Sequence, residues 1–357
     1  MSVVKLCAIL SDSQISVFKT VKGVFIYMDT TLKEKISKLK KEKNAAILAH
    51  YYVNNEVQDI ADYIGDSFYL SRLATTIPEE TLLVCGVSFM GESVKILNPS
   101  KNVILPAPDA DCAMAHMADS EKIDIVRRQY DDVAVVCYIN STSELKTLSD
   151  VCVTSANALK IVKSLPNKNI FFIPDKNLGS YVASQIPEKH FIFNDGFCPV
   201  HHNITPDDIH KVKTLYPDAP VLMHPECEPE VLALADYIGS TSGIIEYACA
   251  SEDDTFIIST ESGVLHELRK RNPNKTFISA TEDFTCYDMK KITLENIYSS
   301  LLNIKNNVTI DDNIRNASLK PLSKMLELSK SKPPQQSPNV CKQPLGSFLA
   351  GINGGNI

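Results

Sequence analysis

Short apolar runs recur along the middle of this chain at a spacing of nearly 90 residues. In the first set, AAILAHYY, VAVVCYIN and APVLMHPE each end near a polar ring, at His50, Tyr138 and His224. Two further sets follow at the same spacing: TLLVCG, NIFFIP and TFIIST, then NVILP, HFIFN and TFISA. Self-similarity at a fixed period of this length is too long for a solenoid repeat and predicts three copies of one small domain.

Within each copy the pattern predicts strand, helix, strand, helix, strand. The apolar runs are short and bounded by turn residues, which is typical of buried parallel strands. The stretches between them, such as ESVKILN and SGVLHELRKRN, carry helical spacing. The sequence therefore predicts an α/β protein with three homologous three-layer αβα domains related by pseudo-threefold symmetry.

The repeats divide the chain into three units with additions at both ends. We expect α/β repeats over 28–116, 117–203 and 204–300, then a C-terminal helical segment over 301–329 and a disordered Pro- and Ser-rich tail over 330–357. Residues 1–27 precede a second plausible start at Met28, and we interpret them as a wrongly assigned upstream start in preference to a transit peptide. Asp29 is the predicted N-cap of the first helix.

Charge and cysteine usage narrow the class of protein. The net charge of −7 argues against a general nucleic-acid binder. No apolar run reaches the ~18 residues of a membrane span. Ten cysteines without a dense, short disulfide framework indicate a reducing compartment, here the cytoplasm, where thiols serve metals or chemistry.

Three of the cysteines, Cys112, Cys198 and Cys286, recur at one place in the repeat, 62, 60 and 62 residues after the first polar ring. One thiolate from each copy predicts a central three-thiolate site, and on an iron–sulfur cluster this leaves one iron open to a substrate. A three-cysteine zinc site is the alternative, although three ligands from separate domains without a local C-x-x-C pair is an unusual zinc layout. The other cysteines are expected to be small buried residues or bystanders.

Polar residues also recur at fixed offsets from the strand ends, where parallel sheets bind ligands. Two positions after each ring lie Tyr52, Asn140 and Glu226, and seventeen positions after it lie Ser67, Ser155 and Thr241. Residues i and i+2 of an extended chain point the same way, and a hydroxyl that opens a helix is suited to anions. Each residue alone favours a structural role, but their coincidence in three repeats favours a binding site. Asp62, Asp150 and Asp236, twelve positions after the rings, are assigned structural roles.

Longer motifs resemble a known family. AHYYVNNEVQDIADYIGDS, GVSFMGESVKILNPSKNVILPAPDADC, FIPDKNLGSYVA, GFCPVHHNITP and LMHPECEPEV resemble the quinolinate synthases over about residues 30 to 328. The resemblance implies three α/β domains around one 4Fe–4S cluster per chain, held by Cys112, Cys198 and Cys286. It implies a transferase of de novo NAD biosynthesis that condenses iminoaspartate with dihydroxyacetone phosphate to quinolinate, releasing phosphate and water.

The resemblance also implies roles for the repeated polar residues. Substrate contacts would come from His50, Ser67, Tyr138, Asn140, Ser155, His224, Glu226 and Thr241. We expect His224 and Glu226 to be the main proton-transfer pair, with His50 and Tyr52 as further catalytic residues. Some members carry a C-x-x-C-x-x-C run at the last ligand, but here only Cys286 is present, so a disulfide switch is not expected there.

The resemblance implies small-molecule substrates, and we expect no binding to nucleic acid or to a membrane. It leaves open a homodimer and functional coupling to the L-aspartate oxidase or dehydrogenase that supplies iminoaspartate. Two other functions remain open on the residues alone. One is another cluster-dependent hydro-lyase, and the other is a non-enzymatic iron–sulfur sensor, for which the acidic chain offers no obvious partner surface.

Overall fold

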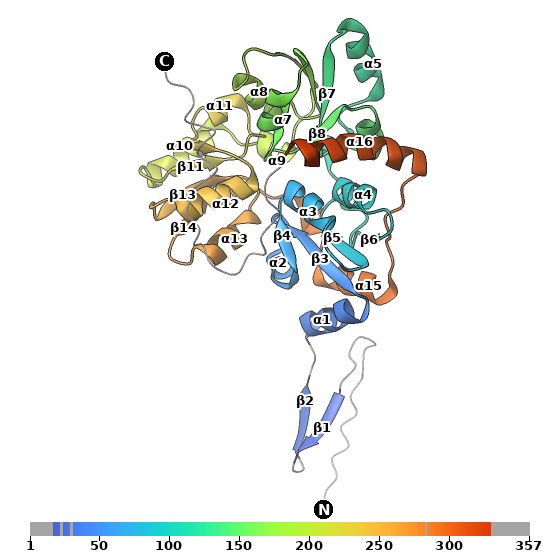
Figure 1. Ribbon diagram of the computed structural model, residues 1–357. Helices are drawn as coiled ribbons and strands as arrows, with labels where there is room; N and C mark the ends of the chain where they lie inside the picture. The colour runs from blue at the N-terminus through green and yellow to red at the C-terminus, as the bar shows by residue number, and fades with distance from the viewer. Residues whose placement is uncertain (1–16, 22–23, 29–30, 283, 330–357) are drawn as a thin grey trace, which may run out of the picture.

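The computed structural model describes residues 17–21, 24–28, 31–282 and 284–329, and it contains three parallel four-stranded sheets (Figure 1). In spatial order the first sheet is β4 (Tyr63–Gly65), β3 (Ala45–His50), β5 (Thr81–Cys85), β6 (Asn102–Ile104). The second is β8 (Val151–Val153), β7 (Val133–Tyr138), β9 (Asn169–Ile173), β10 (His190–Phe193). The third is β12 (Tyr237–Ile238), β11 (Val221–Met223), β13 (Thr255–Ser259), β14 (Thr276–Ser279). The same strand order in all three confirms the predicted α/β class and its repeat.

The helices between and after the strands are short. They are α1 (Leu32–Glu42), α2 (Asn55–Ile60), α3 (Ser67–Ala74), α4 (Ser88–Leu97), the 3-10 turn η1 (Ala113–His116), α5 (Ser120–Gln129), α6 (Ser143–Thr147), α7 (Ala158–Ser164), α8 (Lys176–Ser184), α9 (Pro199–His202), α10 (Pro206–Leu215), α11 (Pro229–Leu232), α12 (Thr241–Ala250), α13 (Val264–Arg271), α14 (Tyr287–Lys290), α15 (Leu294–Asn303) and α16 (Asp312–Leu328).

The third sheet shows most clearly how helices cover both faces. Leu222 of β11 and Ile258 of β13 pack with residues of α12 and α13, whereas Met223 and Ile257 pack with residues of α10 and α11. Successive strand residues point to opposite faces, so this alternation places one helical layer on each side. The repeat is therefore a three-layer αβα unit, as the sequence predicted.

The prediction of three strands per repeat was wrong, because each sheet has a fourth strand at one edge. These strands, β4, β8 and β12, contain only two or three residues each. Each pairs in parallel with the first strand of its repeat. A strand of this length forms no apolar run of its own, and its position becomes visible only from the neighbour with which it pairs.

The N-terminal end of the described chain differs from the sequence expectation. Helix α1 is capped by Thr31, whose hydroxyl accepts the N–H of Glu34 while the Glu34 carboxylate accepts the N–H of Thr31. The predicted cap, Asp29, lies outside the described residues, and the helix begins two positions later than expected. Within the expected leader, β1 (Val17–Val21) pairs antiparallel with β2 (Val24–Met28), a pair that the sequence analysis did not predict. The expected tail, 330–357, also lies outside the described residues.

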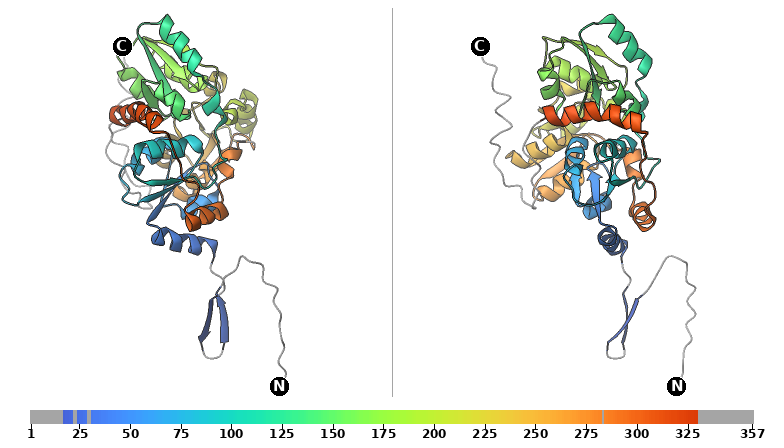
Figure 2. Two further views of the ribbon diagram at one scale, coloured as in Figure 1. Left: turned by 90° about the vertical axis from the view of Figure 1, so that its right-hand side faces the viewer. Right: turned by 45° about the vertical axis from the view of Figure 1, so that its right-hand side comes forward.

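The C-terminal helices tie the first two sheets together. Helix α15 packs against α1 and crosses residue 300, the expected end of the third repeat. Helix α16 lies between the first two repeats, where it packs against α4 of the first and against α6 and β8 of the second (Figure 2). Accordingly, the first and second sheets share one continuous hydrophobic core with these helices.

The aspartate that recurs in each repeat binds the backbone of the first strand. Its Oδ2 accepts one strand N–H at 2.7–2.8 Å: Asp62 from Ile47, Asp150 from Val135, and Asp236 from Val221. The N–H of each aspartate in turn donates to the carbonyl of that same strand residue at 2.9 Å. These residues therefore have a structural role, as the sequence analysis expected. Each one binds the backbone of the first strand just before the edge strand begins.

Replacing Asp150 by alanine should lower the free energy of unfolding. The N–H of fully buried Val135 would lose its acceptor, and an unsatisfied buried donor costs about 1–3 kcal/mol. The lost partner Arg127 adds little, because that ion pair is well exposed. Urea unfolding of the variant should show this decrease beside Asp131→Ala, an exposed aspartate just before β7. Equal stability of both variants would contradict the role.

Candidate functional site

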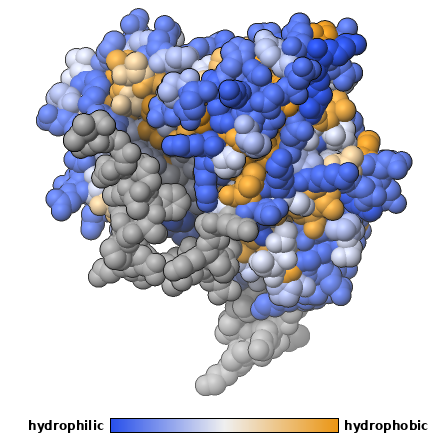
Figure 3. Space-filling model, turned by 45° about the horizontal axis from the view of Figure 1, so that its top comes forward, coloured by the Kyte–Doolittle hydropathy of each residue, from blue (hydrophilic) through white to orange (hydrophobic). Residues whose placement is uncertain are grey.

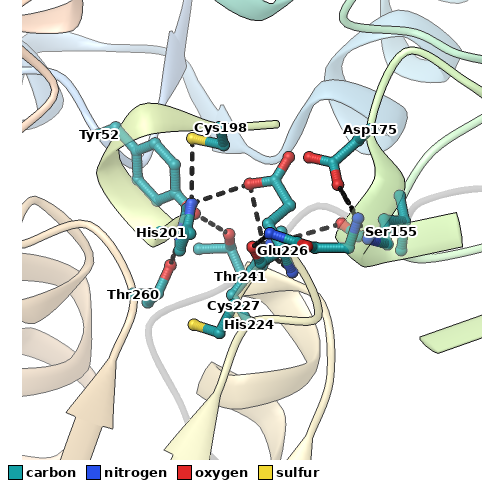
Figure 4. Close-up of polar contacts among 12 residues, drawn as sticks. Tyr52, Ser155, Asp175, Cys198, His201, His224, Glu226, Cys227, Thr241 and Thr260 are labelled. Carbon is teal, nitrogen blue, oxygen red and sulfur yellow. Dashed lines mark hydrogen bonds and ion pairs between the residues drawn. The ribbon is translucent and has the colours of Figure 1, made fainter. Parts of the chain in front are cut away.

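The carboxyl ends of the strands in the three sheets meet. Polar side chains that follow these strands contact one another (Figure 4). The hydroxyl of Tyr52, which follows β3, lies 2.8 Å from the hydroxyl of Thr241, at the start of α12. Nε2 of His224, which follows β11, lies 3.2 Å from the hydroxyl of Ser155 in the second repeat. All three repeats therefore contribute to one cluster, as the repeat pattern predicted.

Glu226 lies at the centre of this cluster and is buried. Its Oε2 is 2.9 Å from Nδ1 of His201 and 3.3 Å from Nδ1 of His224. Burial raises the pKa of Glu226, but the two histidine rings outweigh that effect and hold the pKa below its ordinary value. Within the described part of the chain, Oε1 of Glu226 has no hydrogen-bond partner. The site thus holds an ionised carboxylate with one oxygen free to accept.

His201 was missed by the sequence analysis. It lies in α9, is 1 % exposed, and its Nδ1 is also 3.2 Å from the Cys198 thiol. The corresponding positions of the other repeats hold Ala115 and Met289, so a search for shared positions passes over it. The sequence does place His201 three residues after Cys198, one of the three recurring cysteines, and this proximity could have identified it.

His201 joins Glu226 to Tyr52 through a second residue that was missed. Its Nε2 lies 2.9 Å from the hydroxyl of Thr260, which lies 2.8 Å from the hydroxyl of Tyr52. Burial raises the pKa of Tyr52 well above its ordinary value, and the charge of Glu226 adds to this effect. The phenol therefore stays protonated, and a continuous line of polar groups runs from Glu226 to a hydroxyl that can donate.

His50 is a neutral ring beside Tyr52. Burial lowers its pKa to about 3, and the nearby His224 acts in the same direction. Its Nδ1 accepts the N–H of Tyr52 at 3.2 Å, and the two rings meet edge to face with centroids 4.4 Å apart. The same backbone contact recurs at 3.4 Å between the N–H of Glu226 and Nδ1 of His224. The repeated i, i+2 pair is thus a local unit that orients each ring.

The remaining predicted contacts lie at the same sheet ends. Ser67 and Thr241 are the first residues of α3 and α12, behind the caps Asp66 and Ser240. Ser155 lies three residues before α7, so the expectation that it opens a helix was wrong. Its turn is held instead by a side chain two residues on, since Asn157 accepts the N–H of Thr154.

Tyr138 is buried at the end of β7 in the second repeat and lies close to Glu226, and Asn140 follows two residues later. Burial, followed by the charge of Glu226, raises the pKa of Tyr138 well above its ordinary value. Oδ1 of Asn140 is buried without a hydrogen-bond partner among the described residues. No contact among the described residues joins Ser67 to Glu226. Oε1 of Glu226 and Oδ1 of Asn140 are thus two buried acceptors that are left for a ligand.

Each of the three repeated cysteines is the N-cap of a short helix: Cys112 of η1, Cys198 of α9 and Cys286 of α14. Burial raises the pKa of Cys112 to about 12, and the neighbouring Cys286 adds to the effect. Cys198 has its pKa raised by burial, by Glu226 and by Cys112. Cys112 therefore lies close enough to Cys286 and to Cys198 for their charges to interact, and all three cysteines occupy equivalent helix ends.

This donor set fits a group bound through three thiolates. Like charges close together resist ionisation, so the thiols are neutral alone, and a bound cation would draw off their protons. Backbone N–H groups at the helix ends, such as those of Ala115 and His201, favour the thiolate form. A second group of side chains could hold a single metal ion, because donor atoms of Cys198, His201 and Glu226 lie within 4.8 Å of one another.

A backbone contact repeated in all three copies fixes these cysteines. The N–H that opens the helix after the third strand in each repeat donates to the carbonyl two residues before the cysteine, at 2.7–2.9 Å: Ser88 to Ala110, Lys176 to Gly196, and Ser262 to Phe284. This contact cannot be predicted from the sequence, because it joins backbone groups, which do not depend on residue type. It explains how three loops place their thiols alike.

The fold and site define a three-domain α/β protein with a polar centre where its parallel sheets converge and a thiol contributed by each domain. A family model described as quinolinate synthetase A protein matches residues 34–327. Curated quinolinate synthases are similar over most of their length. The Clostridioides difficile protein is 52% identical over 302 residues, covering 85% of this chain and 99% of that protein. The Fusobacterium nucleatum protein is 52% identical over 298 residues, covering 84% and 99%.

A relative from Sulfurihydrogenibium, 47% identical over 301 residues, covers 83% of this chain and 98% of itself. This chain belongs to the quinolinate synthetase A protein family. Within the described residues, no helix is both long and apolar enough to cross a membrane.

Proposed function

We propose that this chain is a quinolinate synthase that condenses iminoaspartate with dihydroxyacetone phosphate to quinolinate, releasing phosphate and water, as a transferase of NAD biosynthesis. The observation that carries the proposal is the buried, ionised Glu226, set among donors from all three repeats and beside three thiols. The family membership and the relatives' shared name support it.

The site offers suitable partners for such substrates. Both carry anionic groups, and Ser67 and Thr241 present hydroxyls at helix N-termini, where anions are favoured. Tyr138 and Asn140 provide a phenol and an amide for carboxylate oxygens. Ser155, already in contact with His224, provides a third hydroxyl.

Proton transfers fall to the line from Glu226 to Tyr52. Glu226, with its free oxygen, is the base that removes a proton from the substrate, and His201 and His224 stabilise its charge. Tyr52 is the donor at the other end, held through Thr260 and Thr241. The neutral ring of His50 holds the Tyr52 backbone in place.

Cys112, Cys198 and Cys286 would hold a 4Fe–4S cluster, one per chain, and its unligated iron would supply a Lewis acid for a substrate oxygen. Such a cluster suits a reducing compartment such as the cytoplasm. On the face shown in Figure 3, hydrophobic residues are scattered among hydrophilic ones. Family membership supports small-molecule substrates, and we propose a homodimer or coupling to an iminoaspartate-supplying enzyme in addition.

The proposal is tested by anaerobic purification, iron and sulfide analysis, and an assay for quinolinate. We expect quinolinate only when both substrates are supplied. Exposure to air should lower activity in parallel with iron loss, because an iron without a protein ligand is open to oxidants. Dehydration of a single substrate without quinolinate would indicate a different hydro-lyase. Full activity in an iron-free sample would remove the cluster from the mechanism.

A further inference from the structure

Glu261 is a fully buried carboxylate that binds one of the cysteine loops. It lies two residues after β13, and its Oε1 accepts the backbone N–H of Cys286 at 3.1 Å. The same oxygen is 2.9 Å from Nζ of Lys290, and Oε2 accepts the N–H of Gly263 at 2.6 Å. A buried carboxylate with these three donors is well satisfied and holds each of them in a fixed direction.

Lys290 extends this contact to the first repeat. Its Nζ donates to the carbonyl of Tyr52 at 2.6 Å, in addition to its ion pair with Glu261. Lys290 is the last residue of α14, whose N-cap is Cys286. One short helix therefore carries a thiol at its start and the lysine at its end. Nδ2 of Asn54 donates to the Lys290 carbonyl at 3.0 Å and holds the helix end from the other side.

The backbones of the two loops are fitted closely together. A Cβ atom on Gly263 would lie 2.6 Å from the Tyr51 carbonyl oxygen and 2.8 Å from Cα of Tyr52. The amide of Gln58 donates to the carbonyls of both Tyr51 and Gly263, at 2.8 and 3.0 Å. Only a glycine permits this approach, so the Tyr52 loop cannot shift without moving the turn that holds Glu261.

We propose that Glu261 and Lys290 are a positioning pair that fixes the loop of Cys286 and the loop of Tyr52 as one unit. The pair couples a metal ligand of the third repeat to a proton donor of the first. It rests on the proposed ligation by Cys286, and it adds residues that act through others and do not touch the substrate.

The pair is confined to one of the three cysteines. The position of Glu261 is occupied by Val87 in the first repeat and by Asp175 in the second. Asp175 is buried and caps α8, but its Oδ2 has no hydrogen-bond partner in the described part of the chain. Carboxylates also lie at the N–H of Cys112, where Asp111 accepts at 2.8 Å, and near that of Cys198, where Asp175 is placed, but only the Cys286 loop adds a lysine that binds the Tyr52 loop.

The test compares iron release from anaerobically loaded protein to a chelator. Glu261→Gln and Lys290→Met should each release iron about 10–100-fold faster than the wild type, the usual effect of removing a partner that orients a metal ligand. Lys290→Met should also lower kcat more than it raises KM, because the loop that carries the proposed proton donor Tyr52 loses the donor to its carbonyl. The double variant should be little worse than either single variant, since the residues act together.

Glu267→Gln is the matched control. Glu267 is a buried carboxylate of the same repeat that pairs with Arg271 at 2.6 Å, and among the described residues it forms no hydrogen bond or ion pair with either loop. It should release iron at the wild-type rate, even where its thermal stability falls as far as that of Glu261→Gln. Equal acceleration in this control would reduce Glu261 to a structural residue and overturn the pairing.

Two outcomes separate this inference from the proposed function. A wild type that holds no iron after anaerobic reconstitution would overturn the ligation and the pairing together. A wild type that holds iron, with Lys290→Met releasing it at the same rate, would overturn the pairing alone. Lys290 has a side chain that is 23% exposed, so this variant decides the matter where Glu261→Gln fails to fold.

Discussion

Replacing Cys198 by alanine should abolish the bound iron–sulfur cluster and all quinolinate formation. A site with three thiolates has none to spare, and the helix that Cys198 caps offers no second thiol. Cys227 lies near the site, but it is buried and its thiol is directed to the Ser259 carbonyl at 3.9 Å. Iron and sulfide per chain after anaerobic reconstitution should fall from the wild-type content to background, and Cys112→Ala and Cys286→Ala should behave alike.

Two controls separate ligand loss from damage to the fold. Cys249 is half-buried, as the three ligands are, and lies in α12 away from their loops. Cys152 is fully buried in β8. Cys249→Ala and Cys152→Ala should keep the wild-type iron content. A Cys198→Ala protein that still holds a full cluster would overturn the assignment of all three ligands, since the repeat selected them together.

The features that the sequence predicted are those shared by the three repeats. Recurrence at one offset identified the strand ends, the cysteines and the aspartates that bind the strand backbone. It worked because a side chain needed at each equivalent place leaves three copies of the same signal. The three sheets and the convergence of Tyr52, Ser155 and Thr241 follow from that signal and from the geometry of parallel strands.

The features that it missed occur once or involve the backbone. His201, Thr260 and Lys290 have no like residues in the other repeats, and Glu261 has only the shorter Asp175 in the second, so no threefold pattern marks them. Their roles depend on contacts between segments as far apart as Tyr52 and Lys290, and such proximity follows only from the folded chain. The short edge strands and the turn at Ser155 were missed because pairing and local hydrogen bonds, not apolar pattern, define them.

Features shared by the three repeats therefore form the scaffold, whereas residues that occur in only one repeat carry the proposed chemistry. Glu226 illustrates this division. Its position is shared with Tyr52 and Asn140, but only here does a carboxylate occupy it, with His224 two residues before it and His201 supplied by α9. Both histidines act on one oxygen and leave the other free. That asymmetry leaves Glu226 with one oxygen available to a substrate, which is why the proposed mechanism assigns the proton transfer to it.

Replacing Glu226 by glutamine should lower turnover about 10²–10⁴-fold, the usual contribution of a general acid–base group. The amide keeps the shape and one acceptor oxygen but cannot take a proton. Cluster content should stay at the wild-type level, because Glu226 is not one of the three thiolate ligands. Substrate binding should weaken much less than turnover, so the loss should fall on kcat and leave KM nearly unchanged.

Steady-state kinetics on cluster-loaded protein would measure this effect, with Glu228→Gln as the matched control. Glu228 lies two residues further along the same loop, but its carboxylate is directed to His202 at 2.5 Å and Lys176 at 3.4 Å, away from the central group. Its variant should retain turnover within a few-fold of the wild type. Near-normal turnover in Glu226→Gln would make Glu226 a positioning residue, because its remaining function would be to hold His201 and His224. The proton transfer would then fall to His224 or to Tyr52, whose hydroxyl ends the same line of contacts.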